Sequence, residues 1–248
     1  MDAYSNREIY RKCVNAKDLV FTRVNLKETD LFIGSKQDFS QTILAAVKTF
    51  RRILDEHIEN NPEFNISLIP VGYNEHDNDM VKRMCKAAET AGVGPMAAVA
   101  GAFCQTVYEA VRETAAGELI VENGGDLLIW SRSPRTIALY AGESPLSMKL
   151  GLRLEKADPP LGVCASAGTF GHSLSFGKAD MALCVSRDVL LADACATRLG
   201  NTVKTRDDVK HAVEDIFSVP GILGAAAIAG SVIAAVGDLE LVPIDKSL

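Results

Sequence analysis

The sequence predicts an α+β fold in which mixed sheets pack against helices. In its first half, apolar residues recur every three or four positions, the spacing of helices with one buried face. After Glu118 the pattern changes to short apolar runs separated by turn residues, which is typical of strands. Helices and strands that gather in different regions indicate α+β rather than α/β. No Pro- or Ser-rich linker interrupts the 248 residues, so we expect a single domain over residues 1–248.

The first half contains a predicted hairpin followed by helices. An apolar stripe over Ile43, Val47, Phe50 and Leu54 marks the first of these helices. Pro95 opens the last one, whose first residues are small enough for a backbone or a ligand to approach closely. The predicted elements are strands over 19–26 and 31–34, a helix over 37–60, a strand over 64–70, and helices over 79–91 and 96–115.

The second half is predicted to form strands and two helices. Its Ala- and Gly-rich stretch 221–237 has about the minimum length of a membrane span, but internal glycines interrupt it. Two buried strands joined by a turn at Gly230 and Ser231 fit this stretch better. Strands are predicted over 119–122, 126–130, 136–140, 147–154, 162–165, 181–185, 223–229, 232–236 and 239–242, with helices over 188–199 and 206–217.

Composition and charge exclude several classes of protein. A net charge of −6 argues against a protein that binds nucleic acid through a basic face. The six cysteines form no CxxC pair, which indicates reduced thiols rather than disulfides or a zinc site. The polar N-terminal residues lack the apolar core of a secretory signal. We therefore expect a cytoplasmic protein that binds neither nucleic acid nor membrane.

The segment Asn123-Gly124-Gly125-Asp126 lies between two apolar runs. Two adjacent glycines suit a tight hairpin turn because glycine adopts positive φ without strain. The same two glycines would also let a flat ring or a phosphate press against the backbone, with Asn123 and Asp126 as polar edges. Both interpretations remain open from the sequence.

A second segment, 162–173, runs from an apolar strand into a turn rich in Gly, Ser and Thr. The amides and hydroxyls around Ser166, Gly168 and Thr169 can cradle an anion. His172 follows directly and is either structural or placed to carry a proton or contact a phosphate. No GxSxG or GxxxxGK[ST] pattern is present, so neither a hydrolase elbow nor a P-loop is predicted.

A third segment places Asp193 and Thr197 four residues apart on a predicted helix, and therefore on one face. A carboxylate and a hydroxyl at this spacing offer two hard oxygen ligands to Mg²⁺, which usually takes few protein ligands. The alternative is a capping or back-bonding pair on an ordinary helix.

Taken in order over residues 95–200, these three segments resemble the ApbE flavin transferases. The resemblance implies the ApbE-like flavin-transferase fold, with FAD lying across the Gly-Gly-Asp turn and the Ser-Gly loop. It implies Mg²⁺ bound by Asp193, Thr197 and the carbonyl of Ala100, and catalytic roles for His172 and Asp193. FMN would then pass to a hydroxyl of an acceptor protein, with the metal polarising the pyrophosphate.

The chain also departs from that family pattern. The family lysine of an Ala-Lys-Gly segment aligns with Gly101, and the motif expected after His172 is replaced by Ser173–Lys178. One alternative is therefore a flavin- or nucleotide-binding protein, or an oxidoreductase, without the transfer step. Another is thiol-based sulfur chemistry through Cys164 or Cys195, if either thiol has a lowered pKa. The C-terminal Ala/Gly-rich strands suit a subunit interface as well as a core, so a homo-oligomer is also left open.

Overall fold

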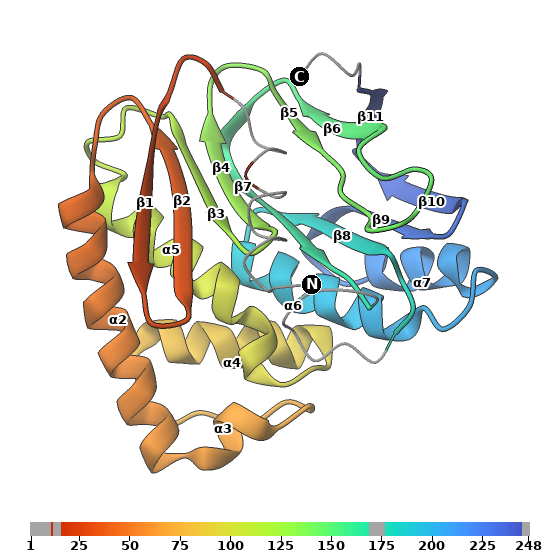
Figure 1. The fold of residues 1–248 in the computed structure, drawn as a ribbon. Helices are drawn as coiled ribbons and strands as arrows, with labels where there is room; N and C mark the ends of the chain where they lie inside the picture. The colour runs from red at the N-terminus through yellow and green to blue at the C-terminus, as the bar shows by residue number, and fades with distance from the viewer. Residues whose placement is uncertain (1–10, 12–15, 169–176, 245–248) are drawn as a thin grey trace.

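The computed structural model describes residues 11, 16–168 and 177–244 of the chain. They form two β-sheets and a layer of helices (Figure 1). The larger sheet, called the main sheet, has eight strands, and the smaller one, called the second sheet, has three. The predicted α+β class is confirmed.

The elements follow the chain in this order. The first half comprises β1 Val20–Leu26, β2 Thr29–Ser35, α2 Ser40–Asn60, α3 Pro62–Ile66, α4 Asp79–Ala91, the 3-10 helix η1 Pro95–Ala98 and α5 Val99–Val111. The second half comprises β3 Leu119–Asn123, β4 Asp126–Ser131, β5 Arg135–Ala138, β6 Leu150–Leu154, β7 Ala157–Ser166, β8 Met181–Ser186, α6 Val189–Thr202, α7 Asp208–Phe217, β9 Ile222–Ala229, β10 Val232–Gly237 and β11 Glu240–Pro243.

Both sheets are antiparallel in every pairing between described strands. The main sheet has the order β1-β2-β3-β4-β7-β8-β9-β10, and the second sheet has the order β11-β6-β5. The predicted mixture of strand directions was therefore wrong. The predicted strand over 239–242 is present as β11, and it pairs with β6 in the second sheet rather than with its neighbours in the chain.

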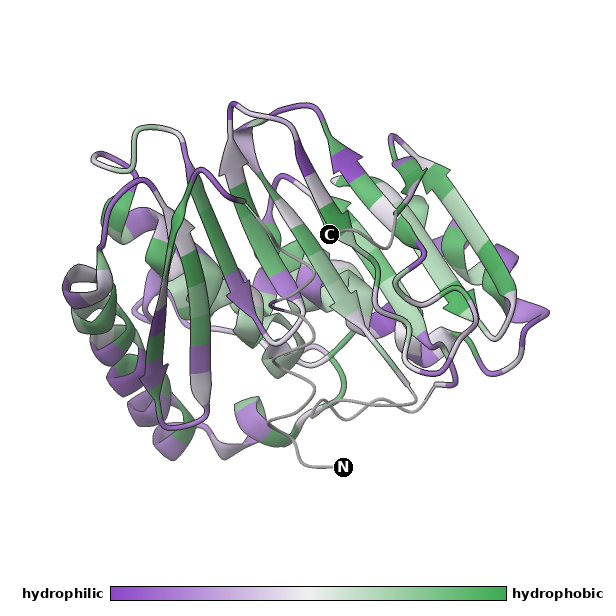
Figure 2. Cartoon of the chain, turned by 45° about the horizontal axis from the view of Figure 1, so that its top comes forward, coloured by the Kyte–Doolittle hydropathy of each residue, from purple (hydrophilic) through white to green (hydrophobic). Residues whose placement is uncertain are grey.

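The inner strands of the main sheet are largely buried and apolar, whereas the edge strands β1 and β10 are more exposed (Figure 2). On β3, Leu119 and Val121 point to the core shared with the helices, which defines the helix-side face. Ile120 points to a separate core that includes Ile137 and Leu152 of the second sheet, which defines the second-sheet face. The fold is thus three layers: helices, main sheet and second sheet.

Two predicted elements differ from the structure for local reasons. Residues 64–70 were predicted as a strand, but Pro62 occupies the first turn of α3, where its fixed φ favours a helix. The single helix predicted over 96–115 is a 3-10 turn followed by α5, which ends at Val111. The predicted hairpins at residues 27–30, 123–126 and 230–231 are confirmed, although β10 is largely exposed rather than buried. Among the described helices, none has the length and apolar character to cross a bilayer.

Candidate functional site

Helix α6 lies at the centre of the candidate site, and two glycines let its first turn approach its neighbours. A Cβ built at Gly101 of α5 would lie 2.6 Å from the carbonyl oxygen of Val189. A Cβ built at Gly162 of β7 would lie 2.5 Å from the Cα of Val189. The side chain of Asp188 caps the helix by accepting from the amides of Leu190 and Leu191. Small residues therefore hold α6 between α5 and β7.

Asp193 points from α6 toward the start of α5. Its Oδ2 accepts a 2.8 Å hydrogen bond from the amide of Gly101, and the residue is 7% exposed. Burial raises its pKa to about 7, although the amides of Gly101 and Ala100 act in the opposite direction. The start of α5 thus lies against a carboxyl group whose charged form is disfavoured by burial and favoured by these two amides.

Asp126, the first residue of β4, lies close enough to Asp193 for the charge of Asp193 to act on its carboxyl group. Burial raises the pKa of Asp126 well above its usual value, and the charge of Asp193 raises it further. The Oδ1 atom of Asp126 is buried without a hydrogen-bond partner in the described part of the chain. Burial and the neighbouring charge of Asp193 thus both disfavour ionisation of Asp126, and a cation bound nearby would oppose this effect.

The turn between β3 and β4 is a hairpin turn that carries the residues predicted from the sequence. Gly124 and Gly125 have φ of 68° and 108°, values that favour glycine. Asn123 donates from its side chain to the carbonyl of Ala100, 3.3 Å away, which ties the turn to the start of α5. The predicted hairpin turn is confirmed, and the polar edge that Asn123 and Asp126 would offer to a ligand stays a prediction.

Ser166 ends β7 with its Oγ buried and without a hydrogen-bond partner among the described residues. This Oγ lies 3.4 Å from a Cβ built at Gly200. Gly200 falls seven residues after Asp193, on nearly the same face of α6. The end of β7 therefore lies along the helix face that carries Asp193.

The described residues that precede and follow 169–176, Gly168 and Gly177, lie against each other. Gly168 donates to the carbonyl of Ala179, and a Cβ built at Gly168 would lie 2.2 Å from the carbonyl oxygen of Gly177. Of the loop residues predicted from the sequence, Ser166 and Gly168 are placed here. Thr169 and His172 lie outside the described residues.

The oxygen donors of this region suit a divalent cation. Asp126 and Asp193 supply carboxylates, Ala100 supplies a carbonyl, and half-buried Thr197 follows Asp193 by one helical turn. No cluster of three or more His, Cys, Asp and Glu side chains forms a metal site in the parts of the chain described. The donor set fits Mg²⁺ because this ion completes its shell with water and phosphate.

Glu122 is a buried acid that the sequence predictions did not select. It is 1% exposed, and burial raises its pKa to about 7. Its Oε1 accepts from the amide of Gly125, and its side chain borders a cavity of about 30 Å³ between the two sheets. The sequence signal was a glutamate in an otherwise apolar strand, Leu-Ile-Val-Glu.

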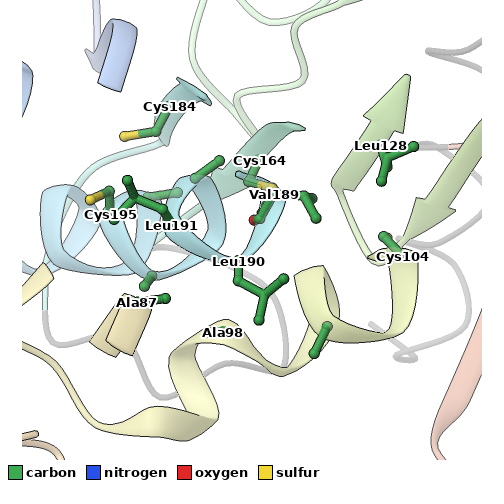
Figure 3. Packing of buried hydrophobic residues seen from close by; sticks show 14 of the residues in the cluster. Ala87, Ala98, Cys104, Leu128, Cys164, Cys184, Val189, Leu190, Leu191 and Cys195 are labelled. Carbon is green, nitrogen blue, oxygen red and sulfur yellow. Dashed lines mark hydrogen bonds between the residues drawn. The ribbon is translucent and has the colours of Figure 1, made fainter. Parts of the chain in front are cut away.

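The cysteines near the site are packed as apolar residues around α6 (Figure 3). Cys164 and Cys195 are each 0% exposed. Burial raises the pKa of the Cys195 thiol to about 12 and that of Cys164 well above its ordinary value. The hypothesis of a thiol with a lowered pKa at either position was wrong.

The chain is similar to known proteins in both sequence and fold. Residues 11–216 of the chain match the protein family described as "AbpE bacteria". The chain belongs to this family. The predicted relation to ApbE-like proteins is thereby confirmed.

Two curated relatives of the "AbpE bacteria" chain are archaeal and carry the description "UPF0280 protein". The one from Methanocella arvoryzae is 37% identical over 217 residues, which cover 88% of each chain. The one from Methanosarcina acetivorans is 42% identical over 189 residues, which cover 76% of this chain and 74% of the relative.

Two solved structures share the fold at low sequence identity. The flavinyl transferase ApbE of Pseudomonas stutzeri, in its apo form, is 13% identical with a TM-score of 0.58, covering 88% of this chain and 94% of its own. The ApbE protein of Thermotoga maritima is 14% identical with a TM-score of 0.60, covering 87% and 96%. Both support an ApbE-like α+β fold for this "AbpE bacteria" chain.

Gly101 explains one departure from the ApbE pattern in physical terms. The sequence aligns it with a family lysine, but here the backbone of Val189 occupies the space that any side chain would need. The positive charge expected at this position is therefore excluded by the close approach of α5 and α6.

Proposed function

We propose that this protein binds FAD together with Mg²⁺ and transfers FMN to a hydroxyl group of an acceptor protein in the cytoplasm. The observation that carries the proposal is that the charge of Asp193 acts on buried Asp126, while the buried hydroxyl of Ser166 lies further along α6, against Gly200. Asp126 and Ser166 each present a buried polar atom without a partner among the described residues. Such atoms are costly unless a ligand satisfies them.

The protein's own groups have separate roles in this proposal. Asp193, Thr197 and the carbonyl of Ala100 hold the cation, while Asp126 contributes a second carboxylate beside it. The Gly124-Gly125 turn and the end of β7 around Ser166 and Gly168, where the Ser166 hydroxyl has no partner among the described residues, contact the phosphates of the nucleotide. A divalent cation held by these residues would polarise a phosphoryl oxygen and offset negative charge in the transition state.

The transfer step forms one bond and breaks another. The acceptor hydroxyl oxygen bonds to the phosphorus of the FMN half, the phosphoanhydride bond breaks, and AMP leaves. The hydroxyl proton passes to a base, a role that we assign to His172 from its place in the sequence after the Ser-Gly loop. Because burial raises the pKa of Asp193, a cation bound there would compete with a proton for its carboxyl group.

Binding is tested by thermal unfolding of the purified chain with FAD, with and without Mg²⁺. A ligand at about 100 times its dissociation constant adds about 2.7 kcal/mol of stability. We expect this stabilisation only when both are present, and we expect Asp193→Asn to remove the part that depends on Mg²⁺. Asp79→Asn, whose side chain is 92% exposed on α4, is the matched control and should keep it.

Ser166→Ala separates ligand binding from folding. Its Oγ has no hydrogen-bond partner among the described residues, so the free variant should unfold at nearly the wild-type temperature while FAD binding weakens. Ser186→Ala is the contrasting variant, because its Oγ donates to the carbonyl of Gly221 and accepts from the amide of Asp188. It should lose about 1–3 kcal/mol of stability without a selective effect on FAD.

Transfer is tested by flavin fluorescence that remains on denatured acceptor proteins, together with AMP release. Binding of FAD and Mg²⁺ without covalent flavin on any acceptor would replace the transfer proposal with a flavin-binding protein that lacks this step. The buried carboxyl pair supports either function, whereas absence of stabilisation by FAD, FMN and ATP would refute both.

A further inference from the structure

The two edges of the main sheet differ in how they are protected. The β1 edge carries Arg23 within the strand and is followed by Lys27 and Glu28, and charges at an edge discourage pairing with another sheet. The β10 edge reads Val-Ile-Ala-Ala-Val-Gly, with no charged residue and no proline. In Figure 1, β10 lies at the end of the sheet opposite β1. An unprotected apolar edge is a template for strand pairing.

Apolar side chains are exposed around this edge. Val232 on β10 and Leu223 on β9 are each 38% exposed, and Phe217 at the end of α7 is 37% exposed. The Phe217 ring lies beside β10, with its Cε2 atom 2.7 Å from a Cβ built at Gly237. Within the described chain, β10 pairs on one side only, with β9.

The side-chain pattern of β10 is complementary to itself. Ala234 and Val236 pack on the helix-side face, whereas Ile233 packs on the second-sheet face. A twofold axis normal to the sheet through Ala234 keeps these faces matched when a second copy pairs antiparallel. Val232 then lies opposite Val236 of the second copy, Ala234 opposite its own counterpart, and Ile233 opposite Ala235.

Charges beyond the strand ends complement one another in the same register. Gly230 of one copy lies opposite Asp238 of the other. The guanidinium of Arg206 lies against Gly230, with Nε 2.5 Å from a Cβ built there. Each twofold-related end therefore brings an Arg206 toward an Asp238, which favours a second copy of this chain over an unrelated strand.

We propose that two copies of this protein join through antiparallel pairing of β10 with β10, centred on Ala234, to form one continuous main sheet across a dimer. The surface lies on the opposite edge of the sheet from β1 and involves none of the residues proposed to bind FAD or Mg²⁺. The dimer is therefore independent of the proposed function, and either can fail without the other.

The first test measures the mass of the full chain in solution by sedimentation velocity and light scattering at increasing protein concentration. We expect a dimer for the wild type and a halved mass for Val232→Lys, which places two like charges in the interface. Val20→Lys is the matched control, since Val20 is 52% exposed on the β1 edge, and it should remain dimeric. A wild-type chain that stays monomeric at every concentration would overturn the proposal.

The second test checks the register. Arg206→Glu and Asp238→Arg should each weaken the dimer, and the double variant should restore it because the pair is reversed. Cysteine at Ala234 should cross-link two copies on mild oxidation, since self-opposed residues bring their Cα atoms to about 4.5–5.5 Å. Cysteine at Ala235, which lies opposite Ile233 instead, should not. A dimer that is neither weakened by the charge reversals nor cross-linked through the introduced cysteine would contradict β10 pairing.

Discussion

Glu122 holds a carboxyl group in surroundings that disfavour its charge. Burial raises its pKa from 4.5 to about 7. Between these pH values the unfolded chain releases the proton while the folded chain retains it. Folding stability contributed by this group is therefore greatest below about pH 4.5, falls as the pH rises toward 7, and is flat above that.

The prediction is that Glu122→Gln removes this part of the pH dependence. The difference in free energy of unfolding between the variant and the wild type should increase between pH 4.5 and 7 by on the order of 3 kcal/mol in favour of the variant. The reason is that glutamine does not ionise and can still accept a hydrogen bond from the Gly125 amide. Denaturant unfolding at a series of pH values measures it. Glu113→Gln, at a side chain that is 85% exposed, should give a flat difference. An equally flat result for Glu122→Gln would mean that the acid is ionised in the folded state.

At the scale of elements, α5 and α6 approach closely at a glycine, Gly101. Gly101 sits inside α5, where replacing glycine with alanine ordinarily favours the helix by about 1 kcal/mol. Here the added Cβ would lie 2.6 Å from the Val189 carbonyl oxygen, too close for ordinary contact. The local preference of the helix and the packing of the pair are thus opposed.

We expect packing to dominate, so that Gly101→Ala destabilises the protein by about 1–3 kcal/mol. It should also disturb Asp193, whose carboxylate accepts from the Gly101 amide. Chemical denaturation gives the first quantity, and Mg²⁺-dependent stabilisation by FAD reports the second. Gly72→Ala serves as control, because nothing lies within 4 Å of its Cβ position. Equal stability of the two variants would show that the helices can separate at little cost.

The elements themselves were largely predictable, because periodicity and turn residues act locally. Asn123 to Asp126 signals its hairpin through adjacent glycines, and Asn78 caps α4 through its side chain. The sheet to which each strand belongs was not predictable, since the pattern of apolar residues in β11 does not distinguish it from a strand of the main sheet. The meeting of Asp126 with Asp193 was inferred only from the resemblance. It depends on how β4 and α6 pack, which neither segment encodes alone.

At the scale of the molecule, the two cores share one sheet. Leu119 and Val121 belong to the helix-side core, while the intervening Ile120 belongs to the core beneath the second sheet. The main sheet borders both cores, so disruption of the sheet on one side would also expose the core on the other side. We therefore propose that the chain behaves as one cooperative domain, as the absence of a linker suggested.

This proposal predicts the behaviour of Leu152→Ala, a fully buried change in the second sheet. It should cost about 2–5 kcal/mol through the cavity it leaves. The single tryptophan, Trp130, packs edge-on against Tyr108 of α5 and reports on the opposite layer. Its fluorescence should shift to the lower midpoint together with the far-UV circular dichroism. Separate transitions for the two signals would show that the second sheet unfolds on its own.

The close packing of helix α6 restricts the substitutions that this sequence can accept during evolution. Buried residues occupy ten of its fourteen positions, and α4, α5, α7, β7 and β8 all pack against it. Larger residues there meet backbone rather than water, so most single changes along the helix are disfavoured. Natural variation at α6 should therefore be concerted, with a gain in bulk on the helix matched by a loss on the neighbour it touches.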